Sequence, residues 1–72
     1  MQYAIVIESA PASSNYSAYV PDLPGCITTG RTIEEVKRNM QEAIELHIAG
    51  LREDGLPVPQ PSTAVATVEV AA

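Results

Sequence analysis

The chain has 72 residues, 46% of them hydrophobic and 18% charged, which is the composition of one folded domain rather than of a disordered segment. Nine acidic residues outnumber four basic ones and give a net charge of −5 at pH 7, so few cations are available to neutralise phosphates. We therefore expect a single domain over residues 1–72 that makes no direct contact with nucleic acid, and whose small core favours association with a partner or with further copies.

Cysteine usage and hydropathy indicate a cytoplasmic protein. Cys26 is the only cysteine, so an intramolecular disulfide and a two-cysteine metal knuckle are excluded. The first residues lack the basic region and apolar run of a secretory signal. The apolar stretches are all shorter than the roughly 18 residues that a membrane span requires. We expect no membrane contact.

The first part of the chain predicts a β-hairpin and a short third strand. Residues 3–8 (YAIVIE) are rich in β-branched side chains and too few for a typical helix, so we expect a central strand there. Its faces would carry Tyr3, Ile5 and Ile7 on one side and Ala4 and Val6 on the other. The turn-forming residues 9–15 lead to a second strand at 16–20, and residues 26–29 predict the third.

The segment PDLPGC between the second and third strands predicts a tight turn. Residues 23–26 fit a type II turn, because Pro24 takes its second position and Gly25 supplies the positive φ of its third. Pro21 ends strand pairing because it has no N–H donor, and Gly30 closes the third strand. We interpret these prolines as structural.

Residues 32–51 give the clearest local signal, that of an amphipathic helix. Thr32 and Glu35 form a capping box at its start. The stripe that we expect to pack on the sheet contains Ile33, Val36, Met40, Ile44, His47 and Leu51, flanked by Ala43 and Ile48. The opposite, mostly acidic arc contains Glu34, Glu35, Arg38, Glu42 and Glu45. Leu46 lies on this polar side, so its burial would need an oligomer or partner contact, although single exposed leucines are common.

After the helix, the chain predicts an extended crossover and a last strand. Gly55 is suited to end the helix, and the prolines at 57, 59 and 61 prevent its continuation. Residues 63–70 alternate with period two, which predicts a strand. The predicted fold is therefore α+β with the order β-β-β-α-β, a three- to four-stranded, mainly antiparallel sheet covered on one face by one helix.

No constellation of residues in the sequence predicts catalysis. The lone His47 falls on the apolar stripe, which favours a core or interface histidine over a general base. Cys26 begins a short strand, where burial is favoured over reactivity. The carboxylates Glu8, Asp22 and Glu69 are scattered, and the glycines form no phosphate-binding loop. We expect no catalytic residue, no cofactor and no metal ion.

Over residues 3–70 the sequence resembles the HicB family of antitoxins. The resemblance rests on the PDLPGC turn, the helix entrance at Gly30 and Thr32, and the run from EAIELHIAGL into EDGLPVPQP. It implies a degraded ribonuclease H-like fold without the acidic metal site of that enzyme. It also implies binding and neutralisation of HicA, a small basic toxin that cleaves mRNA. Many family members add a C-terminal DNA-binding domain; this sequence resembles the short, single-domain members, so we do not expect autorepression by direct DNA binding.

Two functional hypotheses follow. In the first, the chain is the antitoxin of a type II system and binds a HicA-like toxin through charge complementarity, with Glu34, Glu35, Glu42 and Glu45 as the expected contacts. In the second, it is an orphan homo-oligomeric scaffold or ligand-binding domain, a dimer or tetramer, with Leu46 at a contact between copies. Residual hydrolase activity is the least favoured interpretation.

Overall fold

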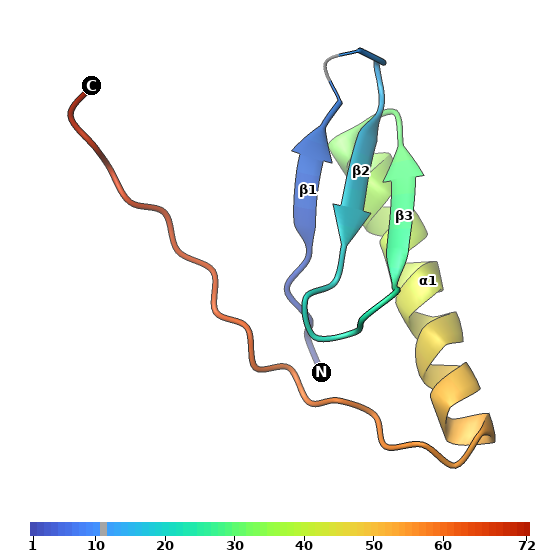
Figure 1. The fold of residues 1–72 in the computed structure, drawn as a ribbon. Helices are drawn as coiled ribbons and strands as arrows, with labels where there is room; N and C mark the ends of the chain where they lie inside the picture. The colour runs from blue at the N-terminus through green and yellow to red at the C-terminus, as the bar shows by residue number, and fades with distance from the viewer. Residues whose placement is uncertain (11) are drawn as a thin grey trace.

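The chain folds into a three-stranded antiparallel sheet followed by one long helix (Figure 1). The computed structural model describes residues 1–10 and 12–72, so Pro11 of the expected turn lies outside the described residues. The elements are β1 (Val6–Ser9), β2 (Tyr16–Tyr19), β3 (Ile27–Gly30) and α1 (Ile33–Glu53). The strands follow one another in the sheet as β1-β2-β3, with Val6 opposite Tyr19 and Tyr19 opposite Ile27. The predicted α+β class and antiparallel sheet are confirmed.

The loop between β2 and β3 is closed by backbone hydrogen bonds around the predicted type II turn. The N–H of Cys26 donates to the carbonyl of Leu23 at 3.1 Å, and Gly25 has the positive φ, 84°, that this turn requires. The N–H of Val20 donates to the carbonyl of Cys26, also at 3.1 Å, so the loop returns on itself. This closure turns the side chain of Leu23 inward, where it is fully buried.

The start of α1 has the Thr32 half of the predicted capping box, and its end has the predicted glycine stop. At the start, the hydroxyl oxygen of Thr32 accepts from the N–H of Glu35 at 3.0 Å. At the end, Gly55 has φ 69°, and the N–H of Leu56 donates to the carbonyl of Leu51 at 2.8 Å. Together with the bond from Gly55 N–H to the Arg52 carbonyl, this is a Schellman motif. The helix is thereby stopped just before the proline-rich segment.

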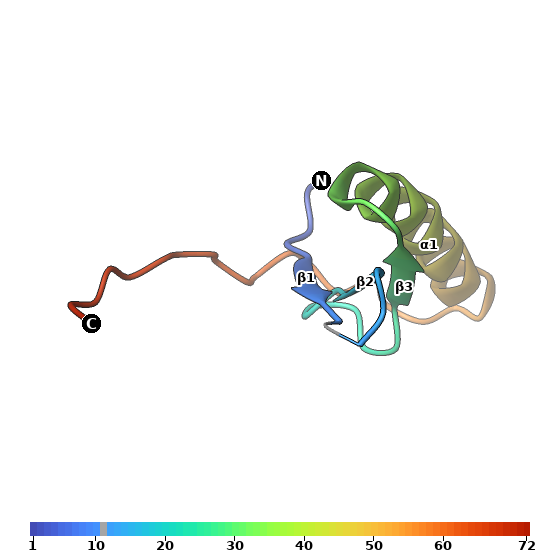
Figure 2. The same ribbon diagram turned by 90° about the horizontal axis from the view of Figure 1, so that it is seen from above.

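The core lies between the sheet and α1, which covers one face of the sheet (Figure 2). The buried side chains are Ala18, Val20, Leu23, Cys26, Val36 and Met40. Tyr3, Ile5, Ile7, Tyr16, Ala43 and Ile44 pack around them. One member of the predicted stripe, Ile33, is 47% exposed at the first position of the helix. On the uncovered face of the sheet, Tyr19 and Ile27 are exposed.

Two strand predictions are wrong. β1 is an edge strand rather than the central one, and it begins at Val6, so residues 3–5 lie outside the ladder. Residues 63–70 are extended and exposed but form no strand in this chain. The alternating pattern predicts the extended conformation of this segment correctly. A strand also requires a neighbouring strand to pair with. The segment has none, because it runs away from the sheet (Figure 1). The radius of gyration, 14.0 Å, accordingly exceeds the roughly 11 Å of a compact domain of this length.

The close approach of Gly30 to α1 provides a test of the packing. A Cβ at Gly30 would lie 2.9 Å from Cγ2 and 3.0 Å from the backbone nitrogen of Val36, which cannot move without the helix. We expect Gly30→Ala to lower the free energy of unfolding by about 1–3 kcal/mol.

Gly50→Ala is the matched control, because a Cβ at Gly50 meets nothing within 4 Å and alanine favours the helix. It should raise the free energy of unfolding by about 1 kcal/mol. Urea denaturation followed by circular dichroism measures both changes. Equal effects of the two substitutions would contradict the packing described.

Candidate partner-binding surface

The outward side of α1 presents a row of carboxylates. Glu34, Glu42 and Glu45 are exposed, whereas Glu35 is half-buried beside the helix start. From Glu34 to Glu45 the row extends about 16 Å along the helix axis. Glu45 also accepts a hydrogen bond from the Gln41 amide at 3.4 Å. The four glutamates predicted as partner contacts thus lie on one helix, three of them open to solvent.

Leu46 lies beside this row and is 74% exposed. Its position on the polar side of the helix agrees with the helical periodicity. A single exposed leucine does not identify an interface by itself, so a contact between copies at Leu46 stays a prediction.

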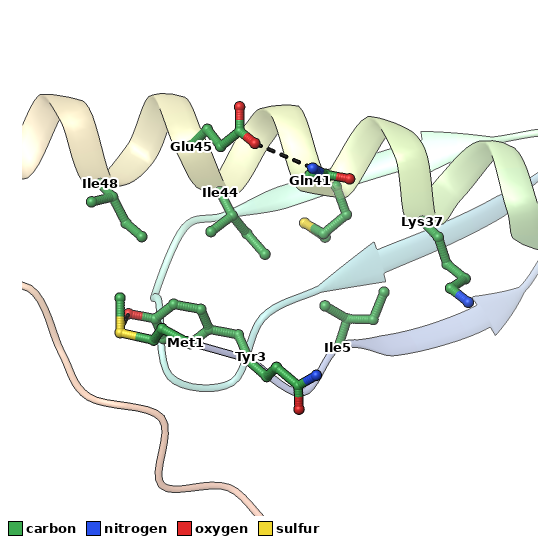
Figure 3. Close-up of a pocket in the computed structure, with 10 residues that line it drawn as sticks. Met1, Tyr3, Ile5, Lys37, Gln41, Ile44, Glu45 and Ile48 are labelled. Carbon is green, nitrogen blue, oxygen red and sulfur yellow. Dashed lines mark hydrogen bonds between the residues drawn. The ribbon is translucent and has the colours of Figure 1, made fainter.

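An apolar groove lies between the residues that precede β1 and the middle of α1 (Figure 3). Its volume is about 680 Å³. Met1, Tyr3 and Ile5 form one wall, and Met40, Ile44 and Ile48 form the other. Gln2, Lys37, Gln41 and Glu45 provide its polar groups. The groove exists because α1 packs on β3 and β2 and leaves the β1 side of the sheet less covered.

The Asp22 carboxylate clamps the start of the C-terminal segment to the β2–β3 loop. It accepts four hydrogen bonds, from the N–H and hydroxyl groups of Ser62 and Thr63, at 2.9–3.2 Å. The Ser62 backbone N–H contributes most to lowering the pKa of Asp22, from 3.8 to about 2. The Tyr3 hydroxyl adds a bond of 2.6 Å to the carbonyl of Pro59. The segment is therefore attached to the body up to Thr63.

Cys26 and His47, the two residues considered above as nucleophile and base, are both at least half-buried. Cys26 is buried with its Sγ 4.0 Å from Sδ of Met40, and burial raises the pKa of its thiol. His47 is half-buried on the stripe of α1.

Across the described ranges 1–10 and 12–72, no three histidine, cysteine or acidic side chains are grouped as metal ligands. Within the same ranges, no helix combines the length and apolarity needed to cross a membrane.

Comparison with known proteins places this fold in a family. Residues 3–71 match the model of the HicB-like antitoxins of bacterial toxin-antitoxin systems, and the chain belongs to this family. A chain of the solved HicA3 and HicB3 toxin-antitoxin complex superimposes with a TM-score of 0.72 and 32% identity, over 86% of this chain and 70% of that one. The match supports the three-stranded sheet and single helix; a likeness to ribonuclease H stays a prediction.

Relatives occur in bacteria, archaea and a phage. A UPF0150 protein of Helicobacter pylori is 39% identical over 81% of this chain and 82% of its own length. A UPF0150 protein of Thermoplasma acidophilum is 34% identical over 94% of this chain and 97% of its own length. A 14.9 kDa protein from the rep-hol intergenic region of Haemophilus phage HP1 is 42% identical over 83% of this chain. The chain spans 44% of the length of that phage protein.

The Asp22 clamp predicts an acid-sensitive attachment of the C-terminal segment. The pKa of Asp22 in the folded chain, about 2, lies below its ordinary value of 3.8. The hydrogen bonds from Ser62 and Thr63 to the Asp22 carboxylate are therefore at full strength above about pH 4 and are lost as the pH falls through about 2. The amide resonances of Ser62 and Thr63 should titrate with that pKa in NMR spectra.

At pH 7, Asp22→Asn should accelerate hydrogen exchange at the same two amides, because the neutral amide group offers one acceptor oxygen in place of a carboxylate. Asp54→Asn removes an equal charge at the end of α1 and serves as the control. Unchanged exchange in Asp22→Asn would show that the carboxylate does not hold the segment.

Proposed function

We propose that this protein is the antitoxin of a type II toxin-antitoxin system and neutralises a HicA-like ribonuclease by binding it. The observation that carries the proposal is the match, at 32% identity and TM-score 0.72, to a chain of a toxin-antitoxin complex. Membership of the antitoxin family over residues 3–71 supports it. The chain would act by contact alone, without catalysis, a cofactor or a metal.

The acidic row on α1 suits such a partner. A protein that cleaves mRNA must attract phosphates, and its RNA-binding surface is therefore basic. Exposed carboxylates at Glu34, Glu42 and Glu45 can pair with the same cations that would otherwise contact RNA, with a smaller contribution from the more shielded Glu35. The net charge of −5 also favours fast association with a basic protein at low salt.

The proposed place of action is the cytoplasm, where mRNA is cleaved. A chain whose one cysteine is a buried thiol is compatible with that reducing compartment. Direct DNA binding forms no part of the proposal, because the acidic chain has few groups to neutralise phosphates.

A second candidate function is a homo-oligomeric scaffold without a toxin. It is favoured by the uncovered face of the sheet, where Tyr19 is 43% and Ile27 71% exposed. Apolar side chains side by side on a sheet face are suited to contact between copies, and Leu46 would extend the apolar surface on the helix. Binding of a toxin distinguishes the two candidates.

Charge reversal on α1 tests the proposed contact. The product of the adjacent gene is co-expressed and co-purified with the chain, and the affinity of the complex is measured by calorimetry at low and high salt. We expect Glu42→Lys and Glu45→Lys each to weaken binding about tenfold and to reduce its dependence on salt, because each places a cation against a basic surface.

Glu53→Lys is the matched control, since it makes the same change of charge on the same helix about 12 Å beyond Glu45. It should bind like the original chain. If the neighbouring gene product does not bind the original chain at low salt, the antitoxin proposal is wrong. If it binds and the reversals have no effect, the toxin contacts another surface.

A further inference from the structure

Leu46 is an exposed apolar side chain on the acidic side of α1. It is 74% exposed, whereas Ile33, the other exposed large hydrophobic residue of the helix, belongs to the stripe predicted to face the sheet. Glu42 lies one helical turn before Leu46, and Glu45 is its neighbour in the sequence. Side chains of a helix lean toward its start, so Leu46 covers the turn that begins at Glu42. An apolar side chain thus stands beside two carboxylates of the acidic row.

The helix has passed beyond the sheet where it carries Leu46. α1 has 21 residues and is about 31 Å long, whereas the four residues of β3 span about 13 Å. The end of α1 accordingly extends past β3 (Figure 1). Ile44 is the last residue of α1 that packs against the core cluster. A partner can therefore approach the outward side of the helix at Leu46 without meeting the strands.

The surface next to Leu46 is open to a partner. Ala49 and Gly50, one turn further along the helix, are both exposed. A Cβ placed at Gly50 would meet nothing within 4 Å, so this side of the helix is not covered there. Because both neighbours are small, atoms of a partner can reach the Leu46 side chain and exclude water from it.

Carboxylates on an exposed helix influence how fast a partner binds more than how long it stays bound. Each exposed ion pair contributes little affinity and is screened by salt, whereas complementary charge accelerates the encounter. Long residence depends mainly on side chains that lose their water at the centre of the contact. A protein that neutralises a toxin through the acidic row needs such a side chain close to the row, and Leu46 is in that position.

We propose that Leu46 is the apolar anchor of the toxin contact and enters an apolar pocket on the toxin whose rim carries cations that pair with Glu42 and Glu45. Leu46 has this role only if the chain binds a toxin as proposed above. The two carboxylates then set the association rate and its dependence on salt, and Leu46 sets the dissociation rate. One surface of the toxin contacts all three side chains.

The kinetics of binding to the product of the adjacent gene separate these two roles. Leu46→Gln replaces the apolar side chain by an uncharged polar one that is also compatible with a helix. We expect it to raise the dissociation rate about tenfold and to leave the association rate and its salt dependence unchanged. Glu45→Gln should instead lower the association rate at low salt, because it removes a charge that attracts the partner.

Leu56→Gln is the matched control, because it makes the same substitution at a leucine that is 52% exposed and lies beyond the end of α1. It should bind and dissociate like the original chain. Circular dichroism of each variant verifies that the helix is retained, and sedimentation of each free chain gives its mass.

If the neighbouring gene product binds the original chain and Leu46→Gln dissociates at the original rate, the anchor is wrong while the antitoxin proposal stands. Equal effects of Leu46→Gln and Leu56→Gln would also overturn the anchor. A lower mass of free Leu46→Gln than of the original chain would place Leu46 between copies, which excludes the assigned contact. If the gene product does not bind the original chain at low salt, both proposals fail.

Discussion

The position of α1 across β2 and β3 is the constraint on which the other features depend. It is set by a small core in which Leu23, from the closed β2–β3 loop, shares one buried cluster with Val36 and Met40 of the helix. The turn at Gly25 brings Leu23 inward, and the absence of a side chain at Gly30 lets the helix begin next to the end of β3. Because this core is concentrated at β2 and β3, the β1 side of the sheet keeps an uncovered groove and a free edge.

This arrangement divides the surface into regions of different chemistry. The outward side of α1 carries Glu34, Glu42 and Glu45, which suit a basic protein. The groove beside β1 is lined mostly by apolar side chains, with Gln2, Lys37, Gln41 and Glu45 as its polar groups. Glu45 lies where the two regions meet, because it belongs to the acidic row and also lines the groove.

The sequence predicts the features that depend on neighbouring residues and misses those that depend on distant ones. The type II turn at Gly25, the cap at Thr32 and the helix stop at Gly55 are each encoded within a few residues, and all are confirmed. The edge position of β1 and the missing neighbour of residues 63–70 depend on how whole elements pack. The role of Asp22 was missed for the same reason, since its hydrogen-bond donors lie 40 and 41 positions further along the chain.

The most direct test of the antitoxin account is a titration of RNA cleavage. The product of the adjacent gene is purified, its cleavage of mRNA is recorded, and this chain is added in increasing amounts at low and at high salt. We expect cleavage to fall to zero at a fixed ratio of the two proteins, and more of the chain to be needed at high salt because screening weakens the contact. Cleavage that persists in excess chain at low salt would contradict it.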